Sequence, residues 1–165
     1  MNEKLKALIA ALREELQAYG EMLALLDQQQ ELVFARAANE LFQSVGEVQA
    51  QTGALEHVRG HRSLCQADLA LAMDLSASAS FGELIPSLPM DYRPLLLALV
   101  DENNQLLQRI HDRVRQNHLL LSRSLEMMQE LINGLAPAQG VRVYDDRGRH
   151  FTRSMAAPSL YQAVG

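Results

Sequence analysis

The chain contains no tryptophan, and aromatic residues make up only 5% of its 165 residues. Its core must therefore be built from leucine, alanine, valine and methionine, a composition that suits helix bundles better than β-sandwiches. The single cysteine, Cys65, excludes an internal disulfide and fits a reducing compartment. The composition therefore favours an all-α protein.

Long apolar runs and an excess of basic residues are also missing. No apolar run reaches 18 residues, and the N-terminal stretch carries Glu3, Arg13, Glu14 and Glu15, so it resembles neither a membrane span nor a signal peptide. We therefore expect a cytoplasmic protein. The formal net charge of −5 argues against a general nucleic-acid binder, which needs a basic face to neutralise phosphates.

Motifs that carry catalysis or bind metal are absent as well. His57 and His61 are four residues apart, a spacing that can hold a metal, but structural histidines are far commoner than ligands. No Glu is followed three residues later by His, which removes the di-iron bundle signature, and there is no phosphate loop or nucleophile elbow. We predict no catalytic residue, no cofactor and no metal site.

The longest regular pattern runs from Leu95 to Leu135, because no proline or glycine lies between Pro94 and Gly134. Spacings of three and four predict one helix of about 40 residues, roughly 60 Å long, which must pack against partner helices to be stable. Asn103 and Asn117, two heptads apart, are interpreted as buried amides that fix the register; the alternative is that they face outward. The predicted buried face contains Leu96, Leu99, Asn103, Leu106, Ile110, Val114, Asn117, Leu121, Leu125, Met128, Leu131 and Leu135.

Two further helices precede this one. Apolar residues at helical spacing predict a first helix from Asn2 to Ala35 that continues through Gly20, and Asn39 is a candidate cap for the second. Glycines 46, 53 and 60 form a stripe on the second helix that either admits a close neighbour or faces solvent. The stripe expected to be buried on the second helix contains Leu41, Val45, Val48, Thr52, Leu55, Val58, Cys65, Leu69 and Ala72.

The segment from Ser76 to Arg93 is a proline-rich connector, since Pro86 and Pro89 forbid a regular helix through it. Its apolar residues predict an ordered cap folded back on the bundle. The predicted fold is an elongated antiparallel bundle of three long helices over residues 1–135. A C-terminal tail, residues 136–165, follows it. The connector residues expected to fold back are Phe81, Leu84, Ile85 and Leu88.

The tail differs in chemistry from the rest of the chain. Val141, Val143 and Phe151 flank the turn sequence 145–148, which predicts a small hairpin, marginal by itself, within a mobile arm. The hairpin region carries a net charge of +2, whereas residues 1–135 carry −7. We therefore expect the tail to be attracted to its own bundle or to an acidic partner.

The end of the long helix is apolar on more than one side. Met127, Met128, Leu131 and Ile132 make a face wider than one packing seam requires, and methionine adapts to a partner helix. This pattern indicates a binding surface for a partner. The alternative is that the tail or the first helix covers it.

The chain also resembles a known family. The run DENNQLLQRIHDRVRQNHLLLSRSLEMM followed by Tyr144-Asp145-Asp146-Arg147-Gly148, and the earlier run EELQAYGEMLALLDQQQELVFARAANELFQSV, are similar to the FlgN-type flagellar export chaperones. The resemblance implies a cytoplasmic chaperone that holds the amphipathic C-terminal helix of a hook-filament junction protein and prevents its premature assembly. Contacts with components of the export apparatus are left open. The partner-binding positions that it implies are Leu121, Leu125, Met128, Leu131, Ile132, Val143 and Tyr144.

Two other classes of function remain on these residues. A structural coiled-coil adaptor or self-assembling bundle would use the same apolar faces, and a weak homodimer is left open. A metal-bound helical enzyme is the third class, and it requires metal retained through purification. The apolar pattern alone does not separate the chaperone from the adaptor.

Overall fold

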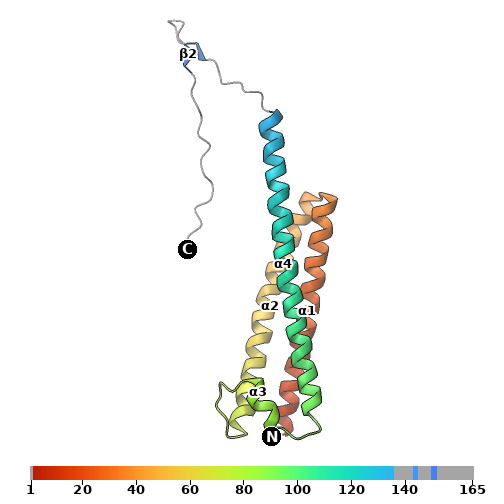
Figure 1. The fold of residues 1–165 in the computed structure, drawn as a ribbon, viewed down its shortest axis with the longest axis vertical. Coiled ribbons are helices and arrows are strands. Elements are labelled where there is room, and N and C mark those ends of the chain that lie inside the picture. Colours follow the sequence, from red (N-terminus) through yellow and green to blue (C-terminus); the bar gives the residue numbers. More distant parts are fainter. Residues whose placement is uncertain (1, 136–142, 145–149, 152–165) are drawn as a thin grey trace. The chain divides into compact units, whose positions relative to one another are not determined.

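The computed structural model describes residues 2–135, 143–144 and 150–151. It confirms the predicted all-α fold, with three long helices packed antiparallel in chain order (Figure 1). Residues 1–122 and 123–165 form two units, which are described separately. The elements are α1 (Asn2–Ala35), α2 (Ala38–Leu71), α3 (Phe81–Leu84), the 3₁₀ turn η1 (Ile85–Ser87), α4 (Arg93–Leu135), β1 (Val143–Tyr144) and β2 (His150–Phe151).

Strands β1 and β2 lie within the segment for which the sequence predicts a hairpin. They pair antiparallel, with Val143 opposite Phe151 and Tyr144 opposite His150. Val141, the turn 145–148 and the rest of the tail lie outside the described residues. A two-residue ladder adds little stability by itself, so the fold depends on the helices.

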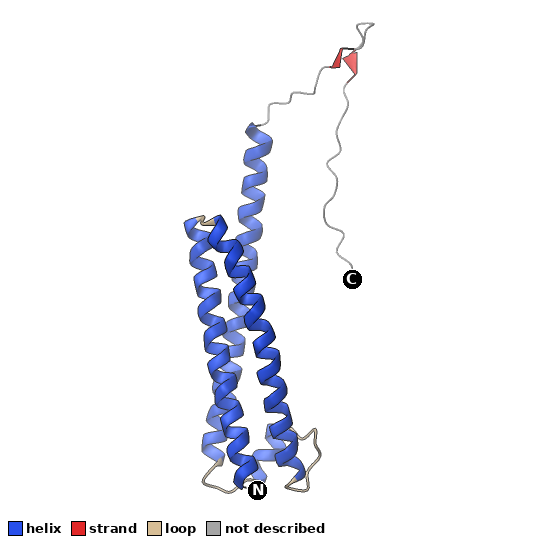
Figure 2. Ribbon diagram, turned by 180° about the vertical axis from the view of Figure 1, so that it is seen from behind, coloured by secondary structure: helices blue, strands red, loops and turns tan. Residues whose placement is uncertain are grey.

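Within residues 1–122, α2 is antiparallel to α1 and to α4, and α1 and α4 run in the same direction (Figures 1 and 2). The apolar residues of α1 recur at helical spacing, so one side of that helix faces the other two along its length. Burying a leucine stabilises the fold by about 1.5–3 kcal/mol relative to leaving it exposed. The leucines with the least exposed surface are Leu5, Leu8, Leu12, Leu26, Leu69, Leu84, Leu88 and Leu96.

The connector forms the predicted ordered cap at one end of the bundle. Leu84, Ile85 and Leu88 are buried in one cluster with residues of α1, α2 and α4, and Phe81 packs against this cluster. Glu83 closes the start of α3 by accepting a hydrogen bond from the backbone N–H of Ser80 at 2.8 Å. Pro94 lies in the first turn of α4, as expected, because that position needs no N–H donor.

The turns that follow α1 and α2 each contain a residue with a left-handed backbone conformation that is not glycine. Arg36 has φ 54° and Asp74 has φ 58°. The N–H of Ala37 donates to the carbonyl of Leu32, and the N–H of Leu75 donates to that of Ala70. These bonds are those of the Schellman motif, which satisfies the last carbonyls of a helix.

The predicted cap at Asn39 is wrong. Helix α2 begins at Ala38, after the cap position Ala37, so Asn39 lies within its first turn. The Schellman bonds at the end of α1 already fix the path of the chain, and they leave only Arg36 and Ala37 between the helices. The helix therefore starts before the asparagine can cap it.

Asn103 and Asn117 occupy the register positions predicted for them. Both are buried, and Asn103 Nδ2 donates to the carbonyl of Leu12 at 3.1 Å, while Asn117 Nδ2 donates to that of Leu26 at 2.8 Å. Each bond joins residues 91 apart in the sequence. The same offset at two levels requires α1 and α4 to run in parallel and in register.

Leu125, Met128 and Leu131, which the sequence predicts to lie on the buried face of α4, are exposed. Val114 is not on the buried face either, contrary to the prediction. It is 47% exposed, and the neighbouring Arg113 turns toward α1 instead. The Arg113 guanidinium lies 2.7 Å from the Asp27 carboxylate and also hydrogen-bonds Gln30. Positions 113 and 114 both lie three or four residues from Ile110 and Asn117, so either could face α1. Asp27 on α1 pairs with Arg113, and therefore Arg113 faces α1 and Val114 does not.

The stripe predicted to be buried on α2 is exposed at three positions. Val45 is 49% exposed, Thr52 is exposed, and Ala72 is exposed just beyond the last residue of α2. At Gly46, Gly53 and Gly60, an added Cβ would meet no other atom within 4 Å. The glycine stripe therefore faces solvent in the described part of the chain.

We predict that Asn117→Ala lowers the free energy of unfolding by about 1–3 kcal/mol, because the buried Gln29 Oε1 loses its donor along with the Leu26 carbonyl. Urea denaturation followed by circular dichroism measures this change. The matched control is Asn104→Ala on the exposed side of the same helix, which should change stability by less than about 0.5 kcal/mol. Equal effects of the two variants would contradict the alignment role.

Candidate partner-binding surface

The last turns of α4 carry large apolar side chains that are exposed. Leu125 is 65% exposed, Met128 55%, Leu131 62% and Ile132 65%. Met127 is 54% exposed, so the apolar surface covers more than one side of the helix. A helix normally buries such residues against a neighbour. These residues can therefore supply the contacts of a helix-in-groove interaction.

The predicted partner-binding residues are distributed over both units. Leu121 lies in the unit of residues 1–122 and is half-buried. The four exposed positions and the strand residues Val143 and Tyr144 lie in the unit of residues 123–165. Within the second unit, Leu125, Met128 and Ile132 follow one another at spacings of three and four, which places them on one side of α4.

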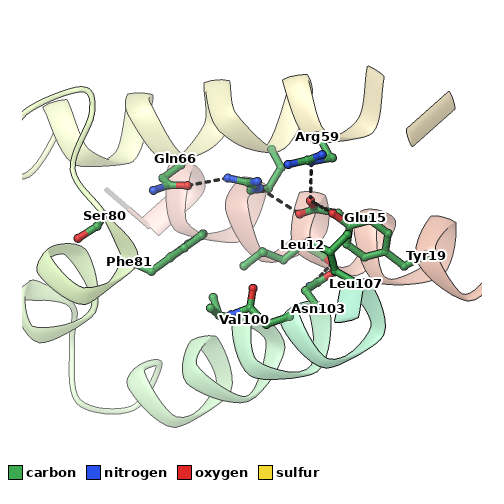
Figure 3. A pocket seen from close by; sticks show the side chains of 12 residues that line it. Leu12, Glu15, Tyr19, Arg59, Gln66, Ser80, Phe81, Val100, Asn103 and Leu107 are labelled. Carbon is green, nitrogen blue, oxygen red and sulfur yellow. Dashed lines mark hydrogen bonds and ion pairs between the residues drawn. The ribbon is translucent and has the colours of Figure 1, made fainter. Parts of the chain in front are cut away.

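A second feature is a pocket of about 420 Å³ in the unit of residues 1–122 (Figure 3). Residues of α1 form its floor, α2 and α4 form its walls, and Phe81 of α3 lies at one end (Figure 3). Its lining is mixed, with apolar, amide and charged side chains. The lining residues are Leu12, Glu15, Tyr19, Arg59, Arg62, Gln66, Ser80, Phe81, Val100, Asn103, Asn104 and Leu107.

Glu15 is the charged residue at the floor of this pocket, and its side chain is only 4% exposed. Arg62 Nε lies 3.0 Å from its carboxylate, Arg59 Nε lies 3.9 Å away, and the Tyr19 hydroxyl donates to it at 2.9 Å. A buried carboxylate is tolerated only when it is paired and hydrogen-bonded in this way. Burial raises the pKa of Tyr19 to about 12, and the negative charge of Glu15 adds to this effect.

Arg62 links this carboxylate to the connector. Its Nη1 donates to Gln66 Oε1 at 3.0 Å, and Gln66 Nε2 donates to the Ala79 carbonyl at 2.8 Å. The guanidinium carbon also lies 5.9 Å from the centre of the Phe81 ring. The chain of contacts therefore ties α1, α2 and α3 together, and it positions one wall of the pocket.

Sequence reasoning missed this network. The apolar spacing of α1 includes Leu16, but this side chain is only half-buried, and Glu15 is buried in its place. The spacing of Glu15 from Leu12 and Tyr19 fits a helix face, but a charged residue is not expected there unless its partner is known. That partner, Arg62, is 47 residues away in the sequence.

Cys65 is partly buried beside His61, and its sulfur lies 3.7 Å from His61 Nε2. His61 Nδ1 lies 3.4 Å from the Glu14 carboxylate. Desolvation raises the pKa of the Cys65 thiol, and the charges of Asp68 and Glu14 add to the increase. A raised pKa disfavours the thiolate, so this arrangement does not activate a nucleophile.

Within residues 2–135 and the two strands, no group of three or more His, Cys, Asp or Glu side chains could hold a metal ion. None of the helices described is both long and apolar enough to cross a membrane. The exposed end of α4 and the pocket are therefore the features to explain.

Comparison with protein families gives one match. The family described as FlgN protein matches residues 1–151 of the chain. No curated protein and no solved structure gave a significant match.

We predict that the phenol of Tyr19 ionises near pH 12 and that this step disappears in Tyr19→Phe. Because the pKa is raised in the folded state, the stabilising contribution of Tyr19 is fully present below pH 10 and is lost as the pH rises through about 12. Ultraviolet titration of the phenolate measures the step. If the step that Tyr19→Phe removes lies near pH 10, the ordinary value of a phenol, the buried pairing of Tyr19 with Glu15 is contradicted.

Proposed function

With residues 1–151 matched, the chain belongs to the FlgN family of flagellar export chaperones for hook-filament junction proteins, and we propose that it binds its substrate through the end of α4. The family is not enzymatic, in agreement with the absence of a catalytic motif in the sequence. The proposed surface contains Leu121, Leu125, Met128, Leu131 and Ile132 of α4, together with Val143 and Tyr144 of β1.

The observation that carries this proposal is the exposure of Leu125, Met128, Leu131 and Ile132, each more than half accessible. Burying one such side chain in a complex gains about 1.5–3 kcal/mol. Association costs about 4–15 kcal/mol, so several anchors are needed for a stable complex. A surface of this size supports binding that is specific and still reversible, as release at the export apparatus requires.

The proposed partner is the amphipathic C-terminal helix of a hook-filament junction protein. Such a helix exposes an apolar face before it assembles, and covering that face prevents premature assembly. The methionines of α4 suit this role because their unbranched side chains adapt to a partner. Binding of the nascent substrate before export places the complex in the cytoplasm.

A structural coiled-coil adaptor is the second candidate, and a weak homodimer or a contact with the export apparatus also stays open. The same exposed residues would serve a second copy of the chain. Sedimentation of the free chain over a range of concentrations separates these cases. A persistent dimer whose dissociation unfolds the chain would favour the adaptor.

We predict that replacing Leu125 and Met128 together by glutamate weakens binding of the junction protein's C-terminal segment at least about 100-fold, because two anchors are lost and charge is buried. Isothermal titration measures the affinity, and circular dichroism checks the helix content, which should not change because both side chains are exposed. The matched control is Leu119→Glu, also on α4 and 61% exposed.

Loss of helix content in the double variant would identify these residues as core. Unchanged affinity in a folded double variant would exclude the end of α4 as the binding surface. Failure of the wild-type chain to bind a junction protein from the same genome would overturn the substrate assignment itself.

Removing the tail tests the contribution of Val143 and Tyr144. A chain ending at Gly134 should bind the same segment at least about tenfold more weakly, because those two residues are lost. Co-purification followed by titration measures this. Unchanged affinity would confine the binding surface to α4.

A further inference from the structure

The pocket lies between two helix faces that continue beyond it along the bundle. On α4 its lining includes Val100 and Leu107, and the same face reaches Val114 and Leu121 at steps of seven residues. On α2 its lining includes Arg59, and steps of seven reach Thr52 and then Val45. Residues seven apart lie on one side of a helix, so each face is a continuous stripe.

Among the described residues, each stripe has one apolar side chain that is left about half exposed. Val45 is 49% exposed and Val114 is 47% exposed, although both are branched apolar residues. Within residues 1–122, both valines belong to helices that bury their other sides against α1. The two faces bordering the pocket therefore have the character of an unfilled position in a helix bundle.

Two polar side chains that line the pocket, Arg59 and Asn103, can still bind further polar groups. Arg59 is 54% exposed and makes one long ion pair, at 3.9 Å, with Glu15, which is already bound by Arg62 at 3.0 Å. Two guanidinium groups thus share one carboxylate, and the pocket has a net positive charge. Asn103 is 6% exposed, and its Oδ1 has no hydrogen-bond partner among the described residues. A ligand with a carboxylate and a donor would satisfy both groups.

We infer that the α2–α4 seat, defined as Val45, Arg59, Val100, Leu107 and Val114, receives an amphipathic helix of the export substrate with an acidic residue in its apolar face. The inference rests on the proposed function, because the substrate is the occupant. Leu121, the last residue of the α4 stripe, is also one of the residues proposed to contact the substrate. The acidic residue pairs with Arg59, and the apolar residues pack on the two valines and Leu107.

The dimensions favour a helix over a small molecule. From Val100 to Leu121 the stripe on α4 covers about 31 Å at 1.5 Å per residue. Apolar positions at steps of seven match the repeat of a helix packed along α4. The seat would fix the orientation and composition of the substrate, whereas the exposed end of α4 supplies apolar anchors that accept many sequences.

The first test compares two substitutions on α4 in the full chain. Val114→Glu should weaken binding of the junction protein's C-terminal segment at least about tenfold, because a charge enters the apolar seat. Leu119→Glu is the matched control, five residues further along the helix and outside the stripe, and it should change the affinity less than twofold. Both side chains are exposed, so thermal melting should be the same for the two variants.

The second test identifies the acidic residue of the substrate. Arg59→Gln is combined with replacement of each acidic residue in the apolar face of the segment by its amide, and affinities are measured for all pairs. One substrate position should couple to Arg59, so that its replacement weakens binding at least about threefold for the wild-type chain and not for the variant. Arg109→Gln, on the exposed side of α4, is the control and should show no coupling.

The outcomes separate this inference from the proposed function. If Val114→Glu and Leu119→Glu bind equally well, and no substrate position couples to Arg59, the seat is not occupied and the inference is wrong. If, in the same experiment, the variant with glutamate at 125 and 128 has lost binding, the proposed function still holds. Absence of binding by the wild-type chain would overturn both.

Discussion

Two hydrogen bonds set the geometry on which the rest of the bundle depends. Asn103 and Asn117 both donate to backbone carbonyls of α1, with the same offset of 91 residues. A shift of α4 by one turn would leave both amides buried without these acceptors, at a cost of about 1–3 kcal/mol each. Apolar contacts alone tolerate such shifts, because one leucine can replace another. The amides therefore make one register much more stable than its neighbours.

This register also places the polar groups of the pocket. With Asn103 beside Leu12, the next turn of α1 brings Glu15 to the level at which Arg62 of α2 reaches it at 3.0 Å. Further along the bundle, the Arg113 guanidinium lies 2.7 Å from the Asp27 carboxylate on α1. Because Arg113 faces α1, the neighbouring Val114 is exposed. The exposure of Val114 is thus a consequence of the pairing between Arg113 and Asp27.

The sequence predicts the helices well because the helical pattern depends on residues only three or four positions apart. Spacing alone locates α1 from Asn2 to Ala35, the connector and the start of α4 near Pro94, and heptad position identifies the two asparagines. It fails where the deciding contact is distant. Glu15 and Leu16 compete for the interior, as do Arg113 and Val114, and each choice depends on a partner on another helix. The cap at Asn39 fails because backbone bonds at Arg36 already determine the turn.

A chaperone of this kind must fold without its partner and still keep apolar surface for it. The bundle meets the first requirement with a core of leucines and with polar pairs that satisfy buried charge. It meets the second because α4 buries one side against α1 through amides and an ion pair, which leaves valine and leucine side chains on its other side exposed. Because amides and an arginine occupy positions of α4 that face α1, apolar residues of α4 remain on the surface. Burial of those residues by a substrate then supplies binding energy without any change in the fold.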